Sequence, residues 1–192
     1  MKIMKAAIVA AAAMVLCAGA ASTAFAQGVG VKGGVLFADL SSDAVKLDKK
    51  TGFEGGLFID GSRDSVVTAQ IEFNFLQKKA ASGSSDVKLN YVEVPVMARI
   101  NIGSRATNGA GVYILAGPSF QAKISETVGS STSSDGFQGF DIGLVGGVGF
   151  EAARIGVEGR YTKGFRQVNK TFSSTNELKS QQFAILASIR FR

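Results

Sequence analysis

The alternation that decides the fold runs through residues 67–75, VTAQIEFNF. Its odd-numbered positions hold Val, Ala, Ile, Phe and Phe, and its even-numbered positions hold Thr, Gln, Glu and Asn. Successive side chains of a β-strand point to opposite faces, so this period of two predicts a strand with one apolar face and one polar face. The same pattern extends on both sides, and the predicted strand spans residues 65–78.

The period of two recurs along the chain and predicts eight strands. Four links are long and polar, and they alternate with three links that are mostly shorter. Long outer loops alternating with short periplasmic turns are typical of bacterial outer-membrane barrels with both termini in the periplasm. We therefore predict an all-β fold, an eight-stranded antiparallel up-and-down transmembrane β-barrel. The predicted strands are 27–38, 51–60, 65–78, 88–102, 111–124, 137–150, 153–163 and 181–192; the long links are 39–50, 79–87, 125–136 and 166–180, and the shorter links are 61–64, 103–110 and 151–152.

Residues 1–26 have the pattern of a cleaved secretory signal peptide. Two lysines precede an uncharged apolar run over residues 6–20, and the AFA of residues 24–26 is a small-x-small cleavage site. An N-terminal transmembrane helix is the alternative, since the apolar run is long enough to span a membrane. Cleavage leaves residues 27–192 as the barrel domain and removes Cys17, the single cysteine. No later run reaches helix-spanning length, so a mature chain in a membrane has to form a closed barrel.

The composition excludes several classes of protein. Hydrophobic residues make up 46% of the chain and charged residues only 19%, which excludes intrinsic disorder. One Cys cannot form a disulfide framework. The chain has no His, so mechanisms that need an imidazole base or ligand are excluded. We expect no catalytic residues, no cofactor and no metal site, and hence a protein that is not an enzyme.

The polar faces of the predicted strands decide between two kinds of barrel. They carry five acidic and five basic residues. Inside a narrow barrel such charges have to pair, because an unpaired buried charge is very unfavourable. The balance favours a membrane barrel with its polar face inside over a soluble, lipocalin-like ligand-binding barrel with its apolar face inside. The ten residues of this predicted interior network are Lys32, Glu54, Glu72, Glu93, Arg99, Lys123, Asp141, Glu158, Arg160 and Arg190.

The interior charges allow two functions. An eight-stranded barrel is just wide enough to be filled by its own side chains, so a plugged interior is the favoured prediction. A narrow, gated, porin-like channel lined by the same charges is the alternative.

Lysines also gather in and beside the predicted long loops. A solvated loop surface is the favoured interpretation, and a basic rim that attracts lipopolysaccharide phosphates is the alternative. The basic residues are spread over separate loops of an exported chain, which argues against nucleic acid as a partner. The residues of this predicted lipopolysaccharide-facing rim are Lys46, Lys49, Lys50, Lys78 and Lys79.

Five short motifs, in this order, resemble the PorT-like outer-membrane β-barrel family. The resemblance covers essentially the whole of residues 27–192. It implies a small eight-stranded barrel in the bacterial outer membrane with a structural or binding role, whose loops contact the envelope or a protein partner. Some members of that family are tied to protein secretion. The motifs are GG at 33–34, YVEVPV at 91–96, LAGP at 115–118, FDIGLVGG at 140–147 and EGRY at 158–161.

Overall fold

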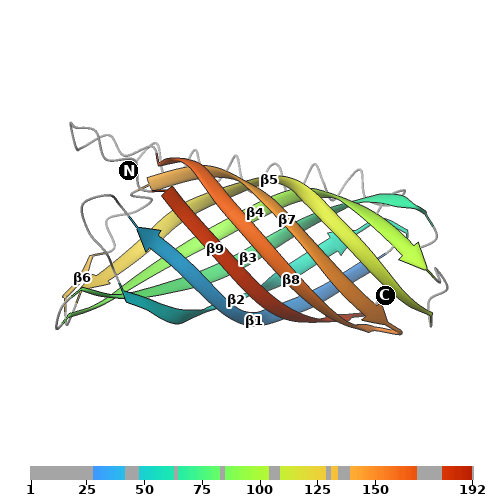
Figure 1. Cartoon of the computed structure of the whole chain (residues 1–192), viewed down its shortest axis with the longest axis horizontal. Coiled ribbons are helices and arrows are strands. Elements are labelled where there is room, and N and C mark those ends of the chain that lie inside the picture. Colours follow the sequence, from blue (N-terminus) through green and yellow to red (C-terminus); the bar gives the residue numbers. More distant parts are fainter. Residues whose placement is uncertain are drawn as a thin grey trace.

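Within the residues that it describes, the computed structural model of the chain contains nine β-strands (Figure 1). Within the described residues no helix is long and apolar enough to cross a membrane. The predicted signal peptide, residues 1–26, lies outside the described residues. The structure describes residues 28–41, 48–62, 65–82, 85–103, 109–128, 131–133, 139–167 and 179–191. The strands are β1 (Gly28–Ser41), β2 (Asp48–Asp60), β3 (Val67–Ser82), β4 (Ser85–Gly103), β5 (Ala110–Val128), β6 (Ser131–Ser133), β7 (Gly139–Ala152), β8 (Ile155–Gln167) and β9 (Lys179–Arg190).

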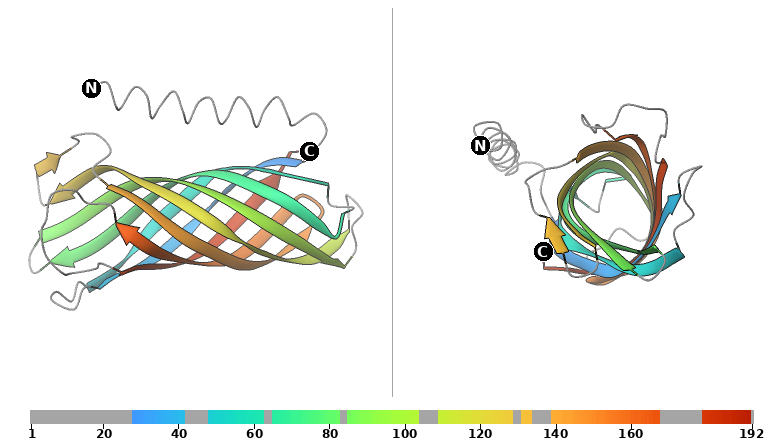
Figure 2. Two further views of the ribbon diagram at one scale, coloured as in Figure 1. Left: turned by 90° about the horizontal axis from the view of Figure 1, so that it is seen from above. Right: turned by 90° about the vertical axis from the view of Figure 1, so that its left-hand side faces the viewer.

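Eight of the strands close into an antiparallel barrel, which confirms the predicted fold. Around the wall the order is β4-β3-β2-β1-β9-β8-β7-β5, and the pairing of β4 with β5 closes the ring. The end-on view in Figure 2 shows this ring. The remaining strand, β6, pairs with the end of β5. Because β1 pairs with β9, the first and last strands form the seam of the barrel.

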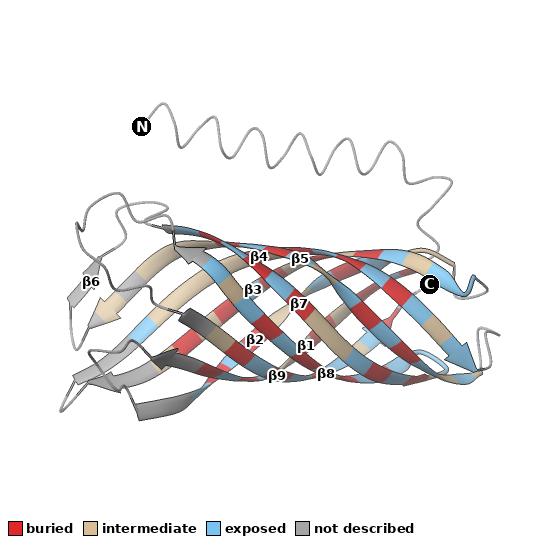
Figure 3. Ribbon diagram, turned by 45° about the horizontal axis from the view of Figure 1, so that its top comes forward, coloured by how far each residue is buried: buried red, intermediate tan, exposed pale blue. Residues whose placement is uncertain are grey.

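Burial alternates along the described parts of the barrel strands, as Figure 3 shows. Outward side chains are mostly apolar and exposed, for example Leu57 at 54%, Leu144 at 53% and Val148 at 55%. Inward side chains include Glu72 at 0% and Arg160 at 1%. A soluble barrel would bury its apolar face, so the lipocalin-like alternative is wrong. The apolar outer surface is the one that a lipid bilayer requires.

The two ends of the barrel differ in how far the strands extend. We call the end with Gly28 and Arg190 the terminal end and the opposite end the loop end. At the loop end β3 and β4 pair until Ser82 lies opposite Ser85, so most of the predicted link 79–87 is strand. The predicted link 125–136 likewise contains the end of β5 and all of β6. The sequence pattern misses these extensions because the apolar alternation stops at the edge of the apolar surface, whereas backbone pairing continues beyond it.

At the terminal end the outer surface remains apolar almost to the turns. Phe150 and Ile155 flank the turn between β7 and β8 and are 50% and 64% exposed. This turn consists of residues 153–154, not of the predicted 151–152, because Glu151 and Ala152 still pair with both neighbouring strands. The strands therefore project beyond the apolar surface mainly at the loop end.

Candidate functional site

The interior of the barrel is crowded with charge. Among the described residues, twelve charged side chains are buried, five of them basic and seven acidic. A buried charge is tolerated when it is paired and hydrogen-bonded, so the contacts of this set decide what the interior can do. The twelve are Lys32, Glu54, Asp60, Glu72, Lys78, Glu93, Arg99, Asp141, Glu151, Glu158, Arg160 and Arg190.

The structure places nine of the ten residues of the predicted interior network in this buried set. The tenth, Lys123, is half-buried on β5. Sequence reasoning missed Asp60, Lys78 and Glu151, so the expected equality of acids and bases is replaced by an acidic excess. All three residues continue the inward alternation of their strands near a strand end, and that alternation is the signal that could have found them.

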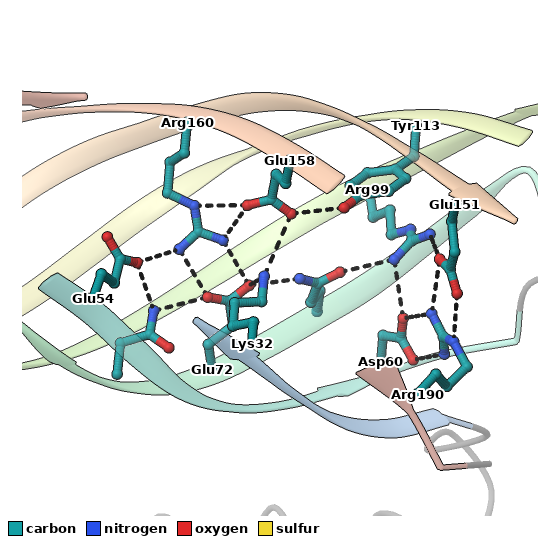
Figure 4. Close-up of polar contacts among 12 residues, drawn as sticks. Lys32, Glu54, Asp60, Glu72, Arg99, Tyr113, Glu151, Glu158, Arg160 and Arg190 are labelled. Carbon is teal, nitrogen blue, oxygen red and sulfur yellow. Dashed lines mark hydrogen bonds and ion pairs between the residues drawn. The ribbon is translucent and has the colours of Figure 1, made fainter. Parts of the chain in front are cut away.

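A central cluster of five of these residues crosses the barrel (Figure 4). Arg160 grips Glu72 with two hydrogen bonds, each 2.8 Å long, from its Nη1 and Nη2 atoms to the two carboxylate oxygens. The same guanidinium donates to Glu158 from Nε at 2.8 Å and to Glu54 from Nη1 at 3.2 Å. Lys32 Nζ lies 2.6 Å from Glu72 Oε1 and 3.4 Å from Glu158 Oε2.

The central cluster joins opposite walls of the barrel. Arg160 is on β8 and Glu72 is on β3, and these strands lie four places apart in the closed ring of eight. Their ion pair therefore spans the full width of the interior. Arg160 is 1% exposed and Glu72 is 0% exposed. A planar guanidinium with several donors suits this position, because it can bind several carboxylates at once.

A second group, the end cluster, closes the interior near the terminal end. Arg190 forms two hydrogen bonds with Asp60, of 2.5 Å and 2.6 Å, and its Nε donates to Glu151 at 2.8 Å. Arg99 donates to the same two acids, at 2.6 Å to Glu151 and 3.2 Å to Asp60. Two guanidinium groups and two carboxylates thus form a closed ring of contacts that draws on β2, β4, β7 and β9.

Two uncharged side chains connect the clusters. Gln70 donates to Glu72 Oε1 at 2.6 Å and accepts a hydrogen bond from Arg99 at 3.2 Å. The Tyr113 hydroxyl donates to Glu158 Oε2 at 2.9 Å, while the Arg99 guanidinium lies 3.7 Å from the centre of the Tyr113 ring. The two clusters therefore form one continuous network. The ten residues predicted for the interior network include neither Gln70 nor Tyr113.

Glycines on the inner face make room for the larger side chains. A Cβ atom at Gly149 would lie only 2.2 Å from the Tyr113 ring, and one at Gly164 would lie 2.3 Å from an Asp141 carboxylate oxygen. Real Cβ atoms do not approach other atoms so closely, so these positions exclude any larger residue unless a neighbour moves.

A third set of contacts lies closer to the loop end. Glu93 accepts hydrogen bonds from the Ser119 hydroxyl and, at 2.8 Å, from Gln121 Nε2. Lys78 Nζ donates to Gln121 Oε1 at 3.0 Å and sits 4.5 Å from the centre of the Tyr91 ring. The prediction that Lys78 belongs to the outer rim is therefore wrong. Its side chain is 1% exposed and points into the barrel, because it continues the inward alternation of β3.

Of the other predicted rim lysines, the structure brings Lys50 and Lys79 together on neighbouring strands. Lys79 is half-buried on β3 and faces outward, since Lys78 before it faces inward. Lys49 and Lys50 lie near the start of β2, where Lys50 is directly opposite Lys79. Lys46 lies outside the described residues.

The chemistry of the interior is that of a packed, hydrogen-bonded filling. Among the described residues, no group of three or more acidic, Cys or His side chains could hold a metal ion. The arginines of both clusters form ion pairs with carboxylates from several strands. Such a network ties the wall together across the interior.

Comparison with known proteins identifies the protein family. The family model described as "Outer membrane protein beta-barrel domain" matches residues 25–170. The chain belongs to this family. A chain with an outer-membrane β-barrel domain and an apolar outer surface is located in the bacterial outer membrane. The match is to the broad family, and it does not single out the PorT-like members.

Solved structures of small outer-membrane proteins share the fold of this barrel domain. Ail, the attachment invasion locus protein of Yersinia pestis, superposes with a TM-score of 0.54 at 15% identity, covering 85% of this chain and 98% of Ail. Ail in complex with the heparin analogue sucrose octasulfate gives a TM-score of 0.53 at 15% identity, with the same coverage of 85% and 98%. Neisserial surface protein A gives 0.51 at 16% identity, covering 85% of this chain and 97% of that one. No curated protein sequence matches the chain.

Proposed function

We propose that the protein is a non-enzymatic, non-conducting scaffold of the bacterial outer membrane, which presents the loop end of its barrel to the cell exterior. The observation that carries this proposal is the ion pair between Arg160 and Glu72, which crosses the whole interior from β8 to β3. With the central cluster and the end cluster stacked along the barrel, water and ions have no wide path. The chain lacks His, which further argues against hydrolytic chemistry at the membrane surface.

The shape of the barrel supports the orientation. Strands that project beyond the apolar surface and longer connections are typical of the extracellular side of outer-membrane barrels, whereas short turns and both termini are typical of the periplasmic side. Here the loop end has the projecting strands and the terminal end has Gly28 and Arg190. A signal peptide at residues 1–26 would supply the export that this location needs.

The binding role of the loop end is directed at anionic material. Ail, which shares the fold, was solved with a sulfated heparin analogue. The present chain has 21 basic and 15 acidic residues, while the buried set inside its barrel is acidic in balance. The excess of basic residues therefore lies outside the buried set, where it favours the binding of anionic groups of the envelope or of a partner. A role in protein secretion, as in some PorT-like proteins, is the alternative partner class.

Electrical recording tests the proposal. Purified, folded protein in planar lipid bilayers is expected to give no stable openings, because the central and end clusters fill the interior. A porin reconstituted in the same bilayers is the positive control, and heat-modifiable mobility on a gel verifies that the barrel is folded. Large, stable, open channels at moderate voltage would refute the scaffold and favour the narrow-channel alternative.

A further inference from the structure

The outer wall carries a row of polar side chains at the loop end, where the apolar surface ends. On β3, β4 and β5 the last apolar row consists of Phe75, Val92 and Ala122, which lie directly opposite one another. The next outward row consists of Gln77, Asn90 and Ser125, again directly opposite one another. We call this second set the amide row.

The amide row is connected by hydrogen bonds. Gln77 Nε2 donates to Asn90 Oδ1 at 3.3 Å, and Asn90 Nδ2 donates to Ser125 Oγ at 2.8 Å. These contacts fix the orientation of the Asn90 amide on the outer surface. A fixed array of amides and a hydroxyl is suited to polar groups such as sugars, and it lies beside the apolar surface, where a lipid head group would lie.

A row of lysines follows one step further from the apolar surface. Lys79 is directly opposite Lys88 on one side and Lys50 on the other. Like charges at directly opposite positions destabilise a sheet. Among the described side chains, neither Lys79 nor Lys88 forms an ion pair. Lys79 and Lys88 are therefore adjacent positive charges that an external anion would stabilise, and the next row outward places Asp48 and Asp86 opposite Ala81.

Two irregularities of the sheet assemble these rows. The register between β4 and β5 shifts next to Asn90, and without this shift Ile124 would take the place of Ser125 in the amide row. The register between β2 and β3 shifts after Lys50, and without it Thr51 would lie opposite Lys79. A shift of one residue exchanges the two faces of a strand, and bulges re-aim side chains in this way. Both shifts put a polar or basic residue in line with its neighbours.

We propose that the amide row and the lysine row together form a binding site for the phosphorylated head group of lipopolysaccharide. The lysines bind phosphate, the amides and the Ser125 hydroxyl bind the sugar, and the adjoining apolar row lies against the acyl chains. The site faces the lipid and not the interior of the barrel. This proposal depends on the proposed function in one respect, which is that the loop end lies at the outer leaflet.

The test compares two double variants of the full-length protein in phosphatidylethanolamine vesicles with and without lipopolysaccharide. Lys79→Gln with Lys88→Gln removes two charges from the lysine row, and Arg154→Gln with Lys163→Gln removes two exposed charges elsewhere on the barrel. Since a lysine near an anionic membrane surface contributes about 1 kcal/mol, the first pair is expected to weaken lipopolysaccharide binding roughly 30-fold. The control pair is expected to bind like the wild type.

Both double variants are expected to fold. In the first, removing charge from the lysine row relieves repulsion, and in the second the two side chains are exposed. Heat-modifiable mobility on a gel measures folding in both. Enzymatically dephosphorylated lipopolysaccharide is expected to bind weakly and equally to all three proteins. Wild-type affinity in the Lys79→Gln, Lys88→Gln protein would overturn the site, as would binding of soluble sulfated glycan without binding of lipopolysaccharide. Channel recordings report separately on the scaffold, so either proposal can fail while the other stands.

Discussion

Replacing Arg160 with methionine is expected to destabilise the barrel by about 3–5 kcal/mol. The change leaves Glu54, Glu72 and Glu158 buried around Lys32 as the one remaining cation of the central cluster. Most of the loss comes from carboxylates that can neither reach water nor find a new donor. Urea unfolding in lipid vesicles, followed by circular dichroism and heat-modifiable mobility, measures the effect.

Two controls separate the network from a general sensitivity to the loss of a positive charge. Arg154→Met removes a positive charge from an exposed position in the turn before β8 and is expected to change stability by less than about 0.5 kcal/mol. Adding Glu72→Gln to Arg160→Met removes one stranded carboxylate and is expected to restore part of the loss. Equal stability of the Arg160→Met and Arg154→Met proteins would show that the central cluster does not hold the barrel together.

An arginine on the lipid-facing wall is expected to be nearly as harmful. Val148 lies near the middle of β7, opposite the uncharged Ile114 and Gly159, and its side chain is 55% exposed. On a soluble protein Val148→Arg would be close to neutral, but at the centre of a bilayer it is expected to cost about 2–4 kcal/mol. Refolding yield and urea unfolding in vesicles measure this difference.

The matched control places the same residue outside the apolar surface. Val66 is 47% exposed in the turn before β3, and Val66→Arg is expected to change stability by less than about 0.5 kcal/mol. Val148→Ala separates the loss of the valine from the gain of a charge. If the two arginine variants were equally stable, the outer wall of β7 would not face lipid.

Much of the barrel can be predicted because one face of every strand is apolar and the other is not. Residues 67–75 give the strand, its faces and the inward direction of Glu72 without any tertiary information. The same parity, continued by a few residues, also assigns Lys78, Asp60 and Glu151 to the interior. These three were missed because each lies at or beyond the edge of the apolar pattern, where the sequence resembles a loop.

The partners across the interior could not be predicted in the same way. Which carboxylates surround Arg160 depends on the closure of β4 on β5 and on the stagger of all eight strands. The register shifts next to Asn90 and after Lys50 are equally hidden, because a bulge changes which residues are opposite without changing composition. The amide and lysine rows therefore became visible only in the assembled sheet.

A cysteine scan of β9 tests most directly whether the barrel is apolar outside and filled inside. Cys17 is the only cysteine of the chain and lies in the predicted signal peptide, so single variants of the mature protein are free of background. In vesicles, fluorophores attached at Ile185→Cys and Ala187→Cys are expected to be quenched by nitroxide-labelled lipids. Ala184→Cys and Leu186→Cys are expected to resist a water-soluble maleimide, because the native side chains there are 1% exposed. Rapid aqueous labelling at these two inward positions would contradict the closed, filled barrel.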